Sequence, residues 1–210
     1  MKKLLFPLMI ALLGSCSAQT KKETTKAQHN MGTQELDTIT LGGGCYWCME
    51  AVFQRMKGVV SSESGFSGGF VKNPAYREVC NGTTGHAEVV QIVFDKKVTS
   101  LEKILAVYFT IHDPTTLNKQ GADEGTQYRS VVLFRNEKQK ETTLDAIKKL
   151  TEEKVYTDPI VTEISPFEVF YKADEYHQNY YNQNKQQPYC QYVVKSKVDK
   201  FEKLFSDIKK

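Results

Sequence analysis

The stretch Gly42-Gly43-Gly44-Cys45-Tyr46-Trp47-Cys48 follows a short β-branched segment and opens a segment with helical spacing. Its glycines permit a tight turn between a strand and a helix, and they let a ligand approach the backbone. A cysteine in the first turn of a helix faces unpaired N–H groups and the positive end of the helix dipole, which favour the thiolate. We therefore predict that Cys45 is a nucleophile at neutral pH and that Cys48, one turn later, attacks its oxidised form.

The two cysteines admit three other interpretations: small residues buried at the start of a helix, a thioredoxin-like redox pair, or ligands of a structural zinc ion. A thioredoxin-like pair usually has its tryptophan before the first cysteine, whereas Trp47 lies between the two. A zinc site needs a second, closely spaced ligand pair. Cys80, His86 and Cys190 do not supply one, so we expect no metal.

Periodicity on both sides of this stretch predicts a mixed order of strands and helices. Strands are expected at residues 37–41, 59–69, 86–94, 130–135, 161–164 and 167–171, and helices at 45–56, 101–111, 137–154 and 198–208. Ser100 and Asn136 are expected to cap two of the helices, the second of them anchored by Leu144, Ile147 and Leu150. The mixed order predicts an α+β fold, a two-layer sandwich with a mixed sheet and flanking helices.

Residues 1–15 have the pattern of an export signal, with two lysines before an apolar run at residues 4–13. That run is too short to span a bilayer, which takes about 20 residues. It leads into Leu13-Gly14-Ser15-Cys16, which resembles a bacterial lipoprotein box and predicts that Cys16 is lipidated. The alternative is simple cleavage near Ala18, which releases a soluble secreted protein.

Residues 16–35 have no aromatic side chain and are rich in Gln, Lys and Thr, so we expect a flexible tether. The folded domain is then expected at residues 36–210, as a monomer that its lipid anchors in the cell envelope, facing the periplasm. Without Lys2 and Lys3 the chain has 26 basic and 25 acidic residues, a net charge of +1. This near-neutral balance argues against nucleic-acid binding.

Six blocks of the sequence together resemble the A-type peptide-methionine sulfoxide reductase family. They are residues 44–53, 76–80, 82–88, 111–115, 125–130 and 176–178, in the order in which the family has them. Tyr46 departs from the pattern, because the family usually has phenylalanine at this position. The resemblance implies a ferredoxin-like core, no cofactor, and a thioredoxin-like reductant as the partner.

The resemblance also assigns roles to individual residues. It implies that Cys45 attacks the sulfoxide and becomes a sulfenic acid as methionine leaves. Glu88, on the apolar face of its strand, is expected to have a raised pKa and to be the general acid. Without the resemblance, an exposed glutamate is the simpler interpretation. Tyr76 and Tyr128 are expected to donate their hydroxyl hydrogens to the same oxygen.

The remaining substrate contacts are implied in the same way. Tyr46 and Trp47 are expected to form the wall that binds the S-methyl group, and Asp123 to order water or the substrate backbone. The histidines of the folded domain are expected to be structural hydrogen-bonding groups rather than metal ligands: His86, His112 and His177.

Two cysteines are candidates for the resolving step. We favour Cys48, because a pair on one helical turn closes a disulfide without a mobile tail. Cys190 is the alternative, because it matches the position at which many family members carry a C-terminal resolving cysteine. Cys80 follows an apolar valine in a family block and is expected to be structural.

The predicted activity is the reduction of methionine S-sulfoxide, free and in oxidised proteins, and hence protein repair. A second enzyme hypothesis is a dithiol oxidoreductase that acts on protein disulfides. A hypothesis without catalysis is a tethered binding lipoprotein with a decayed active site.

Overall fold

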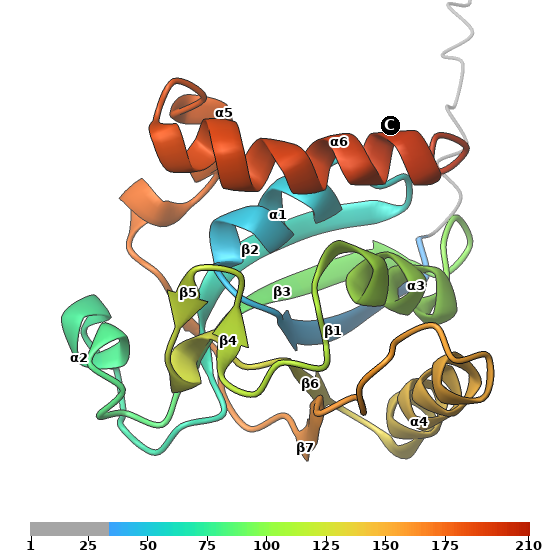
Figure 1. Cartoon of the computed structure of the whole chain (residues 1–210), viewed down its shortest axis with the longest axis horizontal. Helices are drawn as coiled ribbons and strands as arrows, with labels where there is room; N and C mark the ends of the chain where they lie inside the picture. Colours follow the sequence, from blue (N-terminus) through green and yellow to red (C-terminus); the bar gives the residue numbers. More distant parts are fainter. Residues whose placement is uncertain (1–33) are drawn as a thin grey trace, which may run out of the picture. The chain divides into compact units, whose positions relative to one another are not determined.

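The computed structural model describes residues 34–210. The predicted export signal, Cys16 and nearly all of the predicted tether lie outside the described residues. In the described part, a mixed sheet is flanked by helices, and the chain ends after the long helix at the top of Figure 1. The predicted α+β fold is therefore confirmed.

The main sheet has six strands in the order β7-β6-β1-β3-β2-β8. Its neighbours are antiparallel except for the parallel pair β6 and β7. The strands are β1 (Leu36–Gly42), β2 (Val59–Ser67), β3 (Ala87–Asp95), β6 (Val131–Phe134), β7 (Glu163–Pro166) and β8 (Tyr171–Lys172). A separate hairpin pairs β4 (Lys119–Gln120) with β5 (Asp123–Glu124).

Six α-helices lie among residues 34–210. They are α1 (Tyr46–Phe53), α2 (Tyr76–Cys80), α3 (Leu101–Ile111), α4 (Glu137–Glu152), α5 (Tyr180–Gln183) and α6 (Lys195–Leu204). The order β1-α1-β2-β3-α3-β6 is the β-α-β-β-α-β arrangement of a ferredoxin-like core. One face of the sheet buries its apolar side chains against α1, α3 and α6. On the opposite face, Phe167 and Phe170 cover a smaller cluster.

The helix caps follow the predictions. The Ser100 hydroxyl accepts the Lys103 N–H, and the Asn136 side chain accepts the Gln139 N–H. The predicted anchor of α4 is wrong in part, because Leu144 is 47% exposed. Ile147 and Leu150 are partly buried and pack against the core as predicted. The most buried side chains of α4 are polar, and that of Gln139 donates to the carbonyl of Thr38 on β1.

Three predicted boundaries also differ from the structure. The first helix begins at Tyr46 and ends at Phe53, since Cys45 has extended backbone angles and precedes the helix. The strands predicted at residues 161–171 are shorter and are displaced along the chain. The last helix is preceded by a π-helical turn, Cys190–Val194, that the periodicity did not indicate.

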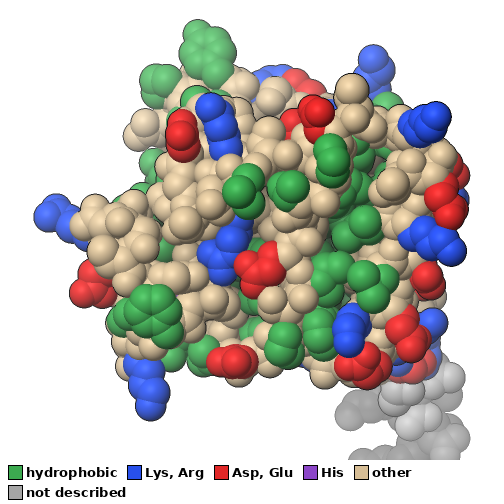
Figure 2. Space-filling view, turned by 60° about the horizontal axis from the view of Figure 1, so that its bottom comes forward, with side chains coloured by type: hydrophobic (Ala, Val, Ile, Leu, Met, Phe, Trp, Pro, Cys, Tyr) green, Lys and Arg blue, Asp and Glu red, His purple; other side chains and the backbone are tan. Residues whose placement is uncertain are grey.

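The surface of the described domain mixes both signs of charge. On the face shown in Figure 2, Lys and Arg side chains lie among Asp and Glu, with hydrophobic side chains between them. Among residues 34–210, no helix has the length and apolar content needed to cross a membrane.

Candidate active site

Cys45 lies at the turn between β1 and α1, in the middle of the molecule. Gly44 precedes it with a φ of +91°, and a Cβ there would lie 2.6 Å from the Gln120 side chain. Both the backbone angle and the space therefore require glycine. The turn places the Cys45 sulfur at the start of α1, as the sequence predicts.

The predicted thiolate state of Cys45 is wrong for this structure. Cys45 is only 7% exposed, and burial raises the pKa of its thiol well above the usual range. The charge of Glu88 acts in the same direction, whereas the Trp47 N–H lowers the pKa. Desolvation outweighs the helix N-terminus because an ion in an apolar site loses its hydration. At neutral pH Cys45 therefore carries a proton.

Cys48 is the easier of the two thiols to ionise. Its side chain is fully buried, and its N–H donates to the Cys45 carbonyl over 3.1 Å. A hydrogen bond from the Cys45 thiol lowers the pKa of Cys48. A thiol that ionises more readily is the better attacking group for a neighbouring oxidised sulfur.

Glu88 lies on β3 and points into the same pocket. Its side chain is 2% exposed, and its carboxyl accepts the N–H of Tyr46 over 3.1 Å. Burial raises the pKa of Glu88 to about 8. The predicted raised pKa is thus confirmed, and the carboxyl is protonated at neutral pH and able to donate a proton.

Tyr76 and Tyr128 are half-buried side chains on the first residue of α2 and the last residue of the 3-10 turn Thr126–Tyr128. Burial raises the pKa of both hydroxyls, and the nearby Glu88 carboxyl raises it further. Both therefore remain hydrogen donors. The structure brings these two tyrosines to Glu88, although they come from separate parts of the chain.

An aromatic wall lies beside the cysteines. Trp47 stacks on Tyr180, with ring centroids 3.7 Å apart and planes 8° from parallel. The Tyr46 ring lies 6.1 Å from Trp47 and 5.5 Å from His177. The predicted pair of aromatic residues is thus present, but Tyr180 is an additional member that the sequence analysis missed.

His177 differs from the prediction that the histidines are structural hydrogen-bonding groups. His86 accepts the Gly69 N–H, and His112 contacts the Tyr108 carbonyl and the Ser130 hydroxyl, as predicted. Neither ring nitrogen of His177 has a hydrogen-bond partner among the described residues. Its ring instead lies among aromatic side chains, 4.5 Å from that of Tyr76.

Asp123, on β5, reaches the site through a residue that the sequence analysis did not single out. The Tyr189 hydroxyl donates to the Asp123 carboxylate over 2.6 Å. A hydrogen bond from Tyr189 also lowers the pKa of Cys48. The only sequence signal for Tyr189 and Tyr180 is their place in a tyrosine-rich C-terminal segment.

The other two cysteines also lie near the site. Cys190 is fully buried, and its pKa is raised by burial and by the nearby Cys48. Cys80 is half-buried, and its thiol interacts with the Tyr76 hydroxyl. Cys80 therefore lies beside one of the expected hydrogen donors, and its structural role stays a prediction. All four described cysteines are free thiols.

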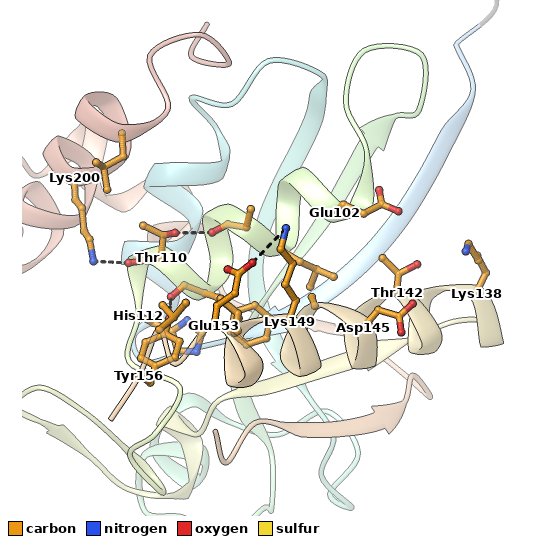
Figure 3. A pocket seen from close by; sticks show the side chains of 17 residues that line it. Glu102, Thr110, His112, Lys138, Thr142, Asp145, Lys149, Glu153, Tyr156 and Lys200 are labelled. Atoms are coloured by element: carbon orange, nitrogen blue, oxygen red, sulfur yellow. Dashed lines mark hydrogen bonds and ion pairs between the residues drawn. The ribbon is translucent and has the colours of Figure 1, made fainter. Parts of the chain in front are cut away.

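A groove of about 810 Å³ lies elsewhere, between α3, α4 and α6 (Figure 3). Apolar side chains such as Phe109 and Leu150 line it, with lysines and carboxylates along its rim. None of the predicted site residues lines this groove. Within residues 34–210, no cluster of His, Cys, Asp and Glu side chains is arranged to hold a metal ion.

The pocket around Cys45 thus combines paired thiols, a protonated carboxyl, two phenols and an aromatic wall. A thiol can attack a soft electrophilic centre there while the carboxyl and the phenols donate hydrogens to its oxygen. This arrangement defines a thiol-dependent oxidoreductase.

Comparison with known proteins identifies the family. A family model described as "Peptide methionine sulfoxide reductase" matches residues 37–209. The peptide methionine sulfoxide reductase MsrA of Saccharolobus solfataricus is 54% identical over 172 residues, which cover 82% of this chain and 96% of that protein. The MsrA of Trichodesmium erythraeum is 51% identical, with coverage of 82% and 97%.

Two solved structures are also similar to this chain. Reduced Mxr1 of Saccharomyces cerevisiae matches with a TM-score of 0.68 and 33% identity, covering 74% of this chain and 90% of that one. Methionine sulfoxide reductase A of Corynebacterium diphtheriae matches with a TM-score of 0.66 and 34% identity, covering 74% and 78%. The chain belongs to the peptide methionine sulfoxide reductase family, and its activity is the reduction of methionine sulfoxide.

Proposed function

We propose that the chain reduces the S epimer of methionine sulfoxide, with Cys45 as the nucleophile and Glu88 as the general acid. The observation that carries this assignment is the buried Glu88 carboxyl, whose pKa is raised to about 8, in the same pocket as the Cys45 thiol. A neutral acid is required because the sulfoxide oxygen must be protonated as it leaves sulfur.

In the first step the Cys45 sulfur attacks the sulfoxide sulfur. Glu88 donates its proton to the sulfoxide oxygen, with Tyr76 and Tyr128 as further donors, and takes up the thiol proton of Cys45. The oxygen passes to Cys45 as a sulfenic acid, and methionine leaves. The high pKa of Cys45 suits this exchange, since both protons are present in the resting site.

Recycling is proposed to proceed through Cys48. Its thiolate attacks the sulfenic acid, a disulfide forms between Cys45 and Cys48, and the oxygen leaves as water. The contact between the two thiols and the lowered pKa of Cys48 support this assignment over Cys190. A thioredoxin-like dithiol then reduces the disulfide and is itself oxidised.

The cellular setting remains a proposal that rests on the sequence. The resemblance of residues 13–16 to a lipoprotein box supports a position on a membrane of the cell envelope, from which a tether would let the domain reach oxidised proteins. Incorporation of radiolabelled palmitate into the wild type but not into Cys16→Ser tests this. Labelling of neither protein contradicts lipidation, and recovery of the protein from the medium would then support simple secretion.

The enzymatic proposal is tested with the purified domain, dithiothreitol and each epimer of methionine sulfoxide. We expect methionine from the S epimer alone, and none from either epimer with Cys45→Ser. Disulfide exchange without sulfoxide reduction would instead indicate the dithiol oxidoreductase, and a protein that binds but does not turn over would indicate a decayed site.

A further inference from the structure

Gln127 is a buried amide beside the pocket that the mechanism above does not use. It lies between Thr126 and Tyr128 in their 3-10 turn and is only 5% exposed. Its Nε2 group donates a hydrogen bond to the carbonyl of Cys80 over 3.1 Å. Burying a side-chain amide is costly unless its polar atoms are bonded, so the partner of Gln127 indicates its role.

This partner lies on α2, the short helix that carries Tyr76. Tyr76 is the first residue of α2 and Cys80 is the last, so the helix has little more than one turn. A helix of this length is not stable through its own hydrogen bonds, and its last carbonyls have no partner within it. The position of the Tyr76 side chain therefore depends on how α2 is attached to the rest of the domain.

Contacts of two kinds attach α2. Val79 is fully buried in the main core, and the Tyr76 ring lies 4.5 Å from that of His177. Apolar burial has no preferred direction, whereas a hydrogen bond has one. The apolar contacts therefore hold α2 against the domain, and the hydrogen bond from Gln127 to Cys80 fixes the orientation of its end.

The backbone around Gln127 is tied to the turn that carries Cys45. The Tyr128 N–H donates to the Gly125 carbonyl over 3.0 Å, and the Tyr128 carbonyl accepts the Gly44 N–H over 3.2 Å. Gly125 has a φ of +142°, and a Cβ there would overlap the Gln127 Oε1 atom, so this position requires glycine. Gln127 therefore connects α2 to the residue that precedes the nucleophile.

A continuous set of contacts thus runs from the nucleophile's turn through Tyr128 and Gln127 to the helix of Tyr76. We propose that Gln127 is a positioning residue for Tyr76, because its amide holds the end of α2 so that the Tyr76 hydroxyl reaches the sulfoxide oxygen. Tyr128 needs no such contact, since it lies on the turn itself. This inference rests on the proposed role of Tyr76 as a hydrogen donor.

The experiment must separate the two phenols. Both are proposed to donate to the same oxygen, so each can mask the loss of the other. Tyr128→Phe leaves Tyr76 as the remaining phenol, and Tyr76→Phe leaves Tyr128. Gln127→Met keeps the length of the side chain but has no hydrogen to donate, and it is introduced into each of these two backgrounds.

The readout is methionine formation in a single turnover at several concentrations of S-sulfoxide. In the Tyr128→Phe background we expect Gln127→Met to lower the maximal rate about three- to tenfold, because a hydrogen bond of the transition state is weakened. The half-saturating concentration should stay within about twofold. In the Tyr76→Phe background the same substitution should change the maximal rate by less than about twofold.

Three other outcomes would overturn the inference. Equal losses in both backgrounds would show a general structural role for Gln127. A loss confined to the Tyr76→Phe background would show that Gln127 acts through its neighbour Tyr128. No loss in either background would show that the hydrogen bond to Cys80 does not affect the reaction.

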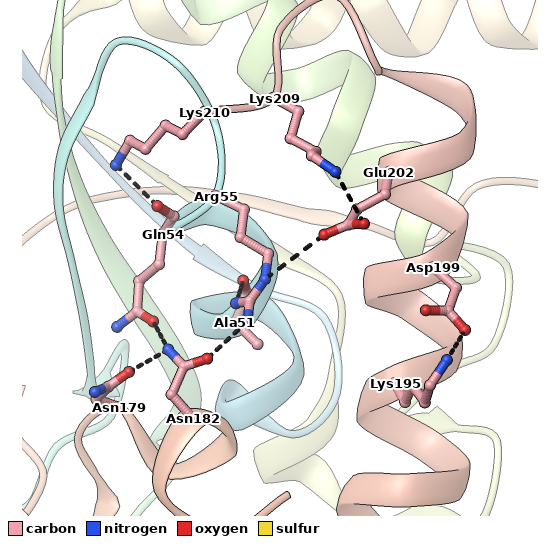
Figure 4. Close-up of polar contacts among 10 residues, drawn as sticks. All are labelled: Ala51, Gln54, Arg55, Asn179, Asn182, Lys195, Asp199, Glu202, Lys209 and Lys210. Carbon is pink, nitrogen blue, oxygen red and sulfur yellow. Dashed lines mark hydrogen bonds and ion pairs between the residues drawn. The ribbon is translucent and has the colours of Figure 1, made fainter.

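Gln54→Met is the matched control, because it makes the same substitution at another hydrogen bond to a short helix. The Gln54 side chain accepts from Asn182 on α5 over 3.1 Å, and Asn182 also accepts from Arg55 over 2.7 Å (Figure 4). These contacts are exposed and lie at the end of α1 away from Cys45. Surface substitutions of this kind have small effects, so the maximal rate should stay within about twofold in both backgrounds.

Gln127→Glu serves if Gln127→Met does not fold. It keeps the shape of the side chain but turns an acceptor oxygen toward the Cys80 carbonyl, and we expect the same pattern of losses. Wild-type activity on the S epimer is measured first, so a failure of the proposed function is seen separately. A double variant Tyr76→Phe, Tyr128→Phe with the wild-type rate would remove both phenols from the mechanism, and the inference with them.

Discussion

The two sides of the pocket are built in different ways. The reacting side comes from β1, the start of α1 and β3, where ladder pairs and helix hydrogen bonds fix each residue. The opposite side comes from residues 173–194, which form only short 3-10, α and π-helical turns. Side-chain hydrogen bonds of Gln178 and Asp123 hold that segment, and Tyr181 and Cys190 pack in the core.

This difference in construction indicates which side of the pocket must be rigid. The sulfur and the proton donor must be placed to within fractions of an ångström, and regular elements provide that. The C-terminal side has only short turns and is held by the hydrogen bonds of Gln178 and Asp123 and by the core contacts of Tyr181, Cys190 and Val194. Substitutions on the reacting side should therefore change kcat, and those on the C-terminal side should change KM or recycling.

The largest effect is expected on the reacting side. Glu88→Gln removes the proton donor, and we expect kcat to fall by about two to three orders of magnitude. In the wild type, activity should decrease as the pH rises past about 8, because Glu88 then loses its proton. Single-turnover rates measured against pH check both statements. A variant that retains wild-type kcat would remove Glu88 from the mechanism.

The resolving step can be used to test which side of the pocket supplies the second thiol. With a thioredoxin system as the only reductant, Cys48→Ser should release one equivalent of methionine and then stop, because its sulfenic acid has no adjacent thiol. Cys190→Ser should turn over within about twofold of the wild type. The number of methionine molecules released per enzyme molecule in the first minutes distinguishes a single turnover from recycling. Full recycling by Cys48→Ser, lost only when Cys190→Ser is added, would transfer the role to the C-terminal side.

A third prediction concerns stability and pH. The pKa of Glu88 is raised in the folded state to about 8 from an ordinary value of 4.5, so the folded state binds its proton more tightly. The contribution is therefore complete below pH 4.5 and is lost as the pH rises toward 8. We expect the free energy of unfolding to fall by on the order of 5 kcal/mol over this range for this group alone. Urea titrations at several pH values should show a flatter profile for Glu88→Gln.

The smallest effect is expected at Tyr46. Its hydroxyl is buried and has no hydrogen-bond partner among the described residues. Tyr46→Phe removes an uncompensated polar group and should raise the free energy of unfolding by about 1 kcal/mol, with kcat/KM nearly unchanged. Thermal melts and steady-state assays measure both quantities. A loss of activity would show that the hydroxyl contributes to the reaction.

Much of the reacting side could be predicted from local sequence. A run of glycines before Cys45 predicts the turn, and alternation along β3 predicts that Glu88 faces the core, because side chains in a strand alternate between faces. The ionisation of Cys45 could not be predicted in this way. It depends on burial by segments far away in the chain, and desolvation there exceeds the effect of the helix end.

The C-terminal side was the harder part to predict. Its turns are too short for a helical or strand period to show, so the π-helical turn and the shifted strands escaped detection. Leu144 was misplaced because the apolar contact of α4 with the core is limited to residues such as Ile147 and Leu150, while Gln139 donates to the Thr38 carbonyl.

The sequence by itself determined the family and the β-α-β-β-α-β core, and it predicted the pair Cys45 and Cys48 and the inward face of Glu88. These follow from local patterns that span a few residues each. Only the tertiary structure decided that Cys45 keeps its proton and that Tyr180 stacks on Trp47. It also decided that Cys80 lies beside Tyr76. The physical reason is that burial, and the pKa values and contacts that depend on it, arise between segments distant in the chain.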